Sequence, residues 1–241
     1  MNKNNYCILN FGDSQGEILD YIFKDNKNYI KNEDDYNIGW KSGWSIRSFL
    51  DNNLINQILK NVKYYKNYYN LIYIFLSFGC TDIEWNLGYK RLKQNNVDTD
   101  IHINEMNIAM TNLIDSLFFL DNIIIIPIFA YFPLPLKKNY LENYNKIHNL
   151  QPYYDLPDLH ERIHLWKKFK NIIINKYKSI DLEKYYIEKG VEYFQREEED
   201  HHPDFIKLQK YLCQELEQFN FHIKPTINKL YPHIRRIRKK E

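Results

Sequence analysis

The sequence predicts an α/β fold in which a parallel β-sheet of about five strands is covered by helices on both faces. Three segments that are apolar along their whole length predict buried strands, at residues 6–11, 70–79 and 122–132. Segments with helical spacing of apolar residues separate these strands and also follow the third. Strands without a polar face that alternate with helices are typical of a parallel sheet buried on both sides.

The first two predicted strands are each bounded by a glycine. The strand "YCILNF" is followed by Gly12, and the strand "NLIYIFLSFG" ends at Gly79. The third, "NIIIIPIFAYF", leads into a proline-rich loop. A short final strand is expected within residues 180–194.

Helices are expected wherever apolar residues recur at intervals of three and four. The first begins after Ser14 and carries Ile18, Leu19, Ile22 and Phe23. Residues 24–37 form a connection, and the glycine-punctuated stretch "IGWKSGWS" at 38–45 is expected to be a loop. The remaining expected helices cover 46–59, 104–119 and 160–177, and a last one starts near Pro203.

The bulk composition limits the class of protein. The chain has 241 residues, which suits a single domain over residues 1–241, with a basic tail from about residue 233. The 33 Lys and Arg residues nearly balance the 31 Asp and Glu residues, so the net charge of +2 does not favour nucleic acid or an anionic membrane. The polar N-terminus, three cysteines and lack of a long apolar run favour a cytoplasmic protein.

Polar and glycine-rich segments follow the predicted strands, where an open parallel sheet binds its ligands. These segments are Gly12-Asp13-Ser14, Ser42-Gly43-Trp44 and Gly79-Cys80-Thr81-Asp82, and the stretch "EEEDHHPDF" near the C-terminus is expected to join them. Together they supply a hydroxyl, loop N–H groups, a histidine and several acids. A turn residue is the simpler interpretation of Ser14 alone, because Gly, Asp and Ser all favour turns and helix N-caps.

The same set of groups meets the needs of acyl transfer. A serine hydroxyl becomes a nucleophile when a histidine takes its proton, and an acid beside the histidine fixes its tautomer. Backbone N–H groups at a glycine turn can stabilise the oxyanion. If Ser14 and His202 work this way, Ser14 Oγ and a ring nitrogen of His202 should lie within ~2.6–3.2 Å.

In these motifs and their order, the chain resembles the SGNH (GDSL-type) hydrolase superfamily. Gly12-Asp13-Ser14 is similar to the first block of that family, and the resemblance implies that Ser14 is the nucleophile. Gly43 in "KSGWS" stands where the second block has its oxyanion-hole glycine, and "FGCTD" resembles the third block, usually GxND. His202 stands like the histidine of the last block, with Glu199 three residues before it. The fold implied is a three-layer α/β/α domain of flavodoxin-like type.

Two positions depart from the family pattern. Thr81 replaces the asparagine that normally donates to the oxyanion, so the oxyanion hole is expected from Ser14, Gly43 and, as a third donor, Thr81. The acid is Glu199 by spacing, whereas Asp200 is the more usual residue type, and both stay candidates. Asp13, Trp44 and Asp82 stand beside these groups and are assigned to substrate binding; Trp44 is equally suited to packing its loop on the core.

The expected function is therefore a serine-dependent esterase or acyltransferase without a cofactor. Its expected partner is a small-molecule or glycan acyl ester, with acetylated carbohydrate as the class that the resemblance implies. No metal site is expected, because His201-His202 are adjacent and neither pairs with a second close His or Cys in the sequence. The alternative is a non-catalytic carbohydrate- or ligand-binding module that keeps the fold, which the replacement at Thr81 leaves open.

Overall fold

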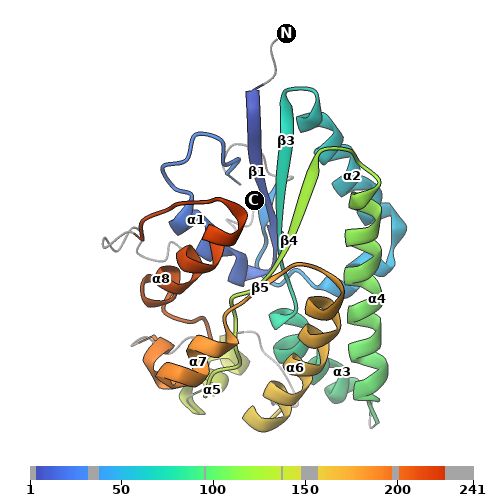
Figure 1. Cartoon of the computed structure of the whole chain (residues 1–241). Coiled ribbons are helices and arrows are strands. Elements are labelled where there is room, and N and C mark those ends of the chain that lie inside the picture. Colours follow the sequence, from blue (N-terminus) through green and yellow to red (C-terminus); the bar gives the residue numbers. More distant parts are fainter. Residues whose placement is uncertain are drawn as a thin grey trace.

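A computed structural model of the chain describes residues 4–31, 38–94, 96–136, 138–147, 157–196 and 201–225. Its centre is a five-stranded parallel sheet with the strand order β2-β1-β3-β4-β5 (Figure 1). The strands are β1 (Asn4–Gly12), β2 (Gly39–Trp40), β3 (Tyr69–Ser77), β4 (Ile123–Phe129) and β5 (Ile180–Asp181). The predicted α/β class with a parallel sheet of about five strands is confirmed.

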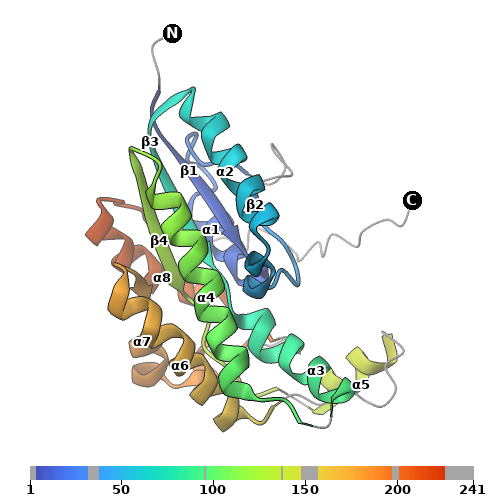
Figure 2. The ribbon, with the colours of Figure 1, turned by 90° about the vertical axis from the view of Figure 1, so that its right-hand side faces the viewer.

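Helices cover both faces of the sheet, which makes three layers (Figures 1 and 2). One face carries α1 (Ile18–Ile22) and α8 (Phe205–Leu216), and the other carries α2 (Asn52–Lys66), α4 (Thr99–Phe118) and α6 (Leu159–Lys176). The shorter helices α3 (Leu87–Lys93), α5 (Lys138–Ile147) and α7 (Glu183–Lys189) lie toward the carboxyl ends of the strands (Figure 1).

The core forms where the two helical layers meet the central strands. Successive side chains of a strand point to opposite faces, so a strand covered on both sides must be apolar at every position. In β1, the consecutive residues Cys7, Ile8 and Leu9 are fully buried, and β3 is buried from Ile74 to Ser77. These two strands pair in register from Asn4↔Tyr69 to Gly12↔Ser77, so their carboxyl ends finish side by side.

The helix expected over residues 46–59 is interrupted. A short 3-10 helix, η2 (Ile46–Leu50), ends at Asp51, whose backbone is extended with φ −87° and ψ 113°. The Asp51 carboxylate then accepts a hydrogen bond from Asn53 N at 2.9 Å and caps α2. A single apolar stripe thus spans two helices, because a side-chain cap competes with continuation of the first one.

Sequence patterns missed several short elements. No helix was predicted directly after Gly79, but the chain turns helical at once and forms a π-helical turn, η3 (Thr81–Asn86), followed by α3. The expected loop at 38–45 contains the two-residue strand β2, and α5 and α7 lie in regions without a clear pattern.

In the described ranges, no helix is long and apolar enough to cross a bilayer. The predicted basic tail from about residue 233 lies outside the described residues. That residues 1–241 form a single domain stays a prediction.

Candidate active site

The hydroxyl of Ser14 and the imidazole of His202 meet at the carboxyl ends of the central strands. Ser14 is the first residue of η1 (Ser14–Glu17), a 3-10 helix that directly follows β1. His202 lies in the short segment before α8. His202 Nε2 is 2.8 Å from Ser14 Oγ, inside the expected range, although 188 residues separate the two in sequence. With Nε2 unprotonated, the Ser14 hydroxyl donates this hydrogen bond.

The backbone around Gly12 fixes where Ser14 stands. A Cβ atom at Gly12 would lie 2.4 Å from the carbonyl oxygen of Ser77 on the neighbouring strand, so only glycine allows the two strands to approach this closely. Asp13 N then donates to the same Ser77 oxygen at 2.9 Å, the last link before the chain leaves the sheet. The nucleophile candidate therefore sits on a turn that is anchored to β3.

Three contacts hold the segment that carries His202. Pro203 forms an antiparallel bridge with Gln195, and the Pro203 carbonyl accepts a hydrogen bond from Arg196 Nε at 2.8 Å. Asp204 caps α8 by accepting from the backbone N–H groups of the first turn. Because these contacts fix the residues on its C-terminal side, the backbone holds His202 toward Ser14 in the folded protein.

Two buried carboxylates join the three glycine-bearing segments. Asp13 accepts from Gln15 N at 3.0 Å and from Thr81 N at 3.2 Å, which ties the first segment to the third. Asp82 accepts from Ser45 Oγ at 2.5 Å and from Ile46 N at 2.8 Å, which ties the third segment to the second. Both side chains are fully buried, so these bonds give Asp13 and Asp82 a clear structural role.

Burial changes the acidity of Asp13. Burial raises its pKa to about 7, against the lowering effect of the two backbone N–H groups, and the neighbouring carboxylate of Asp82 raises it further. Burial also raises the pKa of Asp82, although its hydrogen bonds to Ser45, Ile46 and Asn86 oppose the change. The charge state of the turn before Ser14 therefore changes near neutral pH.

The expected oxyanion donors have different surroundings. Ser14 N–H lies at the start of η1, before the first hydrogen bond of that helix, which Gly16 N makes to Asp13 O. Gly43 is exposed, with φ +74°, in a loop that Lys41 N fastens to Gly12 O at 2.9 Å. A Cβ at Gly43 would meet no protein atom within 4 Å, so its backbone conformation is what favours glycine there.

Thr81 and Trp44 each make contacts within the protein that fix their positions. Thr81 is 4% exposed, and its backbone N–H is bonded to Asp13. The Trp44 ring packs against Phe49 and Phe78, with ring centroids 5.3 and 5.5 Å away. This is the packing role that the sequence allowed for Trp44, and substrate binding by it stays a prediction. The two acid candidates, Glu199 and Asp200, lie outside the described residues.

A buried polar cluster beside the site was not anticipated from the sequence. Glu84 forms an ion pair with Arg162, with Oε1 2.6 Å from Nη1, and also accepts a hydrogen bond from the Tyr131 hydroxyl. Cys80 Sγ lies 3.5 Å from Glu84 Oε2 and accepts from Gln15 Nε2 at 3.4 Å. The spacing of four between Cys80 and Glu84 could have signalled a shared helical face, but Arg162 is too distant in sequence for any local pattern to reveal it.

Two open hollows lie away from Ser14 and His202. One, of about 380 Å³, is bounded by Tyr73, Ile123 and Phe219. The other, of about 560 Å³, is bounded by Tyr6 and Asn28. Neither hollow is lined by Ser14 or His202, whose contact lies at the carboxyl ends of the strands.

The comparisons with known proteins do not identify a family for this chain. No family model matches the chain, and no curated protein matches it. Among solved structures, a chain described as a "putative platelet activating factor" from Streptococcus pneumonia is similar, with 14% identity and a TM-score of 0.49. The likeness covers 91% of this chain and 86% of that one. A likeness at this level of identity does not bear on activity.

Proposed function

We propose that this protein is a serine-dependent acyl-ester hydrolase or acyltransferase of the SGNH type. The observation that carries the proposal is the distance of 2.8 Å between His202 Nε2 and Ser14 Oγ at the carboxyl ends of a parallel sheet. A hydroxyl and an imidazole in this relation are the minimum machinery of nucleophilic acyl transfer.

The reaction follows from the two groups. As Ser14 Oγ bonds to the acyl carbon, its proton passes to His202 Nε2 and the carbonyl oxygen becomes an oxyanion. The protonated imidazole then gives the proton to the leaving alkoxide as the ester bond breaks, which leaves an acyl group on Ser14. Water yields a hydrolase and another hydroxyl or amine yields a transferase, with His202 taking the proton from the acceptor in the second step.

The oxyanion would be held by the N–H groups of Ser14 and Gly43, with the Thr81 hydroxyl as a third donor. An acid from the segment before His202 would orient the imidazole, and Glu199 and Asp200 are the two candidates. Acetylated carbohydrate is the substrate class in this proposal, on the basis of the sequence resemblance alone.

Covalent labelling tests the proposal directly. A fluorophosphonate probe should label the wild-type protein, with the adduct on Ser14 by peptide mass spectrometry. Ser14→Ala should abolish labelling. Ser179→Ala is the matched control, because the Ser179 hydroxyl donates to a backbone carbonyl, Tyr177 O, just before β5, and β3 and β4 separate β5 from β1 in the sheet. A folded wild-type protein that takes no label would refute the enzyme and favour the ligand-binding module.

Isosteric variants separate the two acid candidates. Glu199→Gln and Asp200→Asn each remove a charge and keep the shape, so hydrolysis of an activated acetyl ester reports which carboxylate orients the imidazole. We expect Glu199→Gln to lower kcat and Asp200→Asn to leave it nearly unchanged. The opposite result would reassign the acid to Asp200, and no effect of either would make Ser14 and His202 a dyad.

A further inference from the structure

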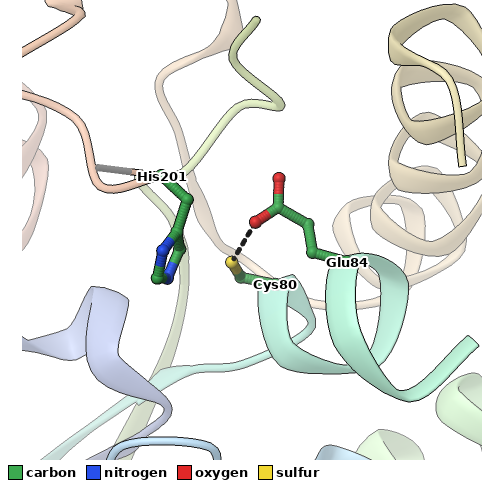
Figure 3. Close-up of side chains that lie close together, drawn as sticks. All are labelled: Cys80, Glu84 and His201. Atoms are coloured by element: carbon green, nitrogen blue, oxygen red, sulfur yellow. Dashed lines mark hydrogen bonds between the residues drawn. The ribbon is translucent and has the colours of Figure 1, made fainter. Parts of the chain in front are cut away.

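Three side chains with metal-binding atoms converge next to the candidate active site. The Cys80 thiol, the Glu84 carboxylate and the His201 imidazole each offer one atom, and these atoms all lie within 4.8 Å of one another. Figure 3 shows Cys80 Sγ between the imidazole of His201 and the carboxylate of Glu84. The sequence predicted no metal here, because His201 lies 121 positions after Cys80 and only the fold unites them.

Local backbone geometry places Cys80 and Glu84 on one face. They are four positions apart at the start of a helical segment, and such residues lie one above the other. The segment contains the π-helical turn Thr81–Asn86. Such turns are rare in proteins, and those that occur are frequently found at functional sites. Both side chains are buried, Cys80 at 2% and Glu84 at 0% exposure, so the pair is not a solvated surface cluster.

The hydrogen bond of His201 is typical of a metal-bound histidine. Its Nδ1 is 2.7 Å from the Tyr140 hydroxyl, and Figure 3 shows the His201 ring on the side of Cys80 Sγ opposite Glu84. Histidine ligands usually bond a second group through the nitrogen that does not bind the metal, which fixes the ring. The bond to Tyr140 leaves Nε2 as the ligand atom.

The two oxygens of Glu84 have different surroundings. Oε1 is bonded to Arg162 and Tyr131, whereas Oε2 faces Cys80 Sγ at 3.5 Å. A tetrahedral zinc ion holds sulfur at about 2.3 Å and nitrogen or oxygen at about 2.0–2.2 Å, so its ligand atoms stand roughly 3.4–3.6 Å apart. Cys80 and Glu84 already meet this spacing, and Arg162 and Tyr131 hold the carboxylate in place.

We propose that Cys80 Sγ, Glu84 Oε2 and His201 Nε2 form a site for a divalent transition metal ion such as Zn²⁺. The thiol proton of Cys80 leaves to solvent as the sulfur–metal bond forms, and water fills the fourth position. A mixed thiolate, imidazole and carboxylate set selects zinc-like ions over Mg²⁺ or Ca²⁺, which prefer oxygen ligands alone. The rings of His201 and His202 lie 3.9 Å apart, so the ion would be bound directly beside the imidazole that faces Ser14.

Cobalt titration of the full chain tests this site without any assay of activity. Tetrahedral Co²⁺ bound by a thiolate gives a sulfur-to-cobalt charge-transfer band in the near ultraviolet. We expect this band to saturate at one Co²⁺ per chain and to disappear when Zn²⁺ is added. Cys80→Ala should abolish the band, whereas Cys213→Ala, which removes another buried thiol, should leave it intact.

Two further variants complete the test. His201→Ala should weaken Co²⁺ binding by at least about 100-fold, and Tyr140→Phe by roughly 10-fold to 100-fold, because the phenol orients a ligand. A wild-type protein with no stoichiometric band, or a band that survives in Cys80→Ala, would overturn the proposal. If Cys80→Ala does not fold, unchanged Co²⁺ affinity in folded His201→Ala would overturn it equally.

Discussion

Replacing Asp13 by asparagine should change how the stability of the protein depends on pH. Burial raises the pKa of Asp13 from 3.8 to about 7, so between these values the folded protein holds a proton that the unfolded chain has released. The stability contributed by this proton is fully present below pH 3.8 and is lost as the pH rises through 7. The two pKa values differ by about 3, which corresponds to a total loss of about 4 kcal/mol.

The assay is urea unfolding of wild type and Asp13→Asn at pH 5 and pH 8. Over this interval the carboxyl should lose about 2–3 kcal/mol of its contribution, so the wild type should lose that much stability relative to the variant. The amide also replaces one of the oxygens that accept from Gln15 N and Thr81 N. This cost is independent of pH and cancels when the two conditions are compared. A difference between the two proteins that is the same at both pH values would refute a raised pKa at Asp13.

The remaining predictions concern the catalytic pair, a close contact and a buried histidine. Ser14→Ala and His202→Gln should each lower kcat for an activated acetyl ester by at least about 10³-fold, and the double variant by little more, because the two act as a unit; losses that multiply would contradict this. Gly79→Ala should destabilise the fold by about 2–6 kcal/mol in urea unfolding, because the residue has φ +116° and its Cβ would lie 2.7 Å from the Phe169 ring; a loss below about 1 kcal/mol would contradict it. Burial lowers the pKa of His102 from 6.5 to about 4, so between these values the unfolded chain binds a proton that the folded protein does not, and stability should fall as the pH drops. The variant His102→Gln should lack that loss; equal dependence of stability on pH in the wild type and the variant would count against it.

The sheet could be predicted because burial on both faces leaves a strong signal. A strand such as residues 70–79 must be apolar at consecutive positions, and few other structures require this. Short elements carry no comparable signal. The turn Thr81–Asn86 buries the side chains of Asp82 and Glu84, and helical periodicity does not anticipate buried acids.

In the candidate site too, some residues could be selected from the sequence and others could not. Ser14 could be selected because glycine and turn residues mark strand ends, and parallel strands bring those ends together, whereas Gly43 and His202 were selected by the order of the motifs. The roles of Asp13 and Asp82 in joining the segments could not be predicted, because Thr81 and Ile46 donate to them through backbone N–H groups, which every residue except proline supplies. Arg162 belongs to α6 and is 78 residues from Glu84 in the sequence, so only tertiary packing brings the two side chains together.

The distance in sequence between Ser14 and His202 has a consequence for local unfolding. His202, the candidate base, lies in the segment that leads into α8. Helix α8 packs on α1, the helix that follows Ser14 in the sequence. Peripheral units of a fold can open locally at a lower free energy than the central strands. Opening of α8 alone would withdraw the imidazole while the sheet and Ser14 stayed native. Ester hydrolysis should therefore be lost at a lower denaturant concentration than the circular dichroism of the whole chain.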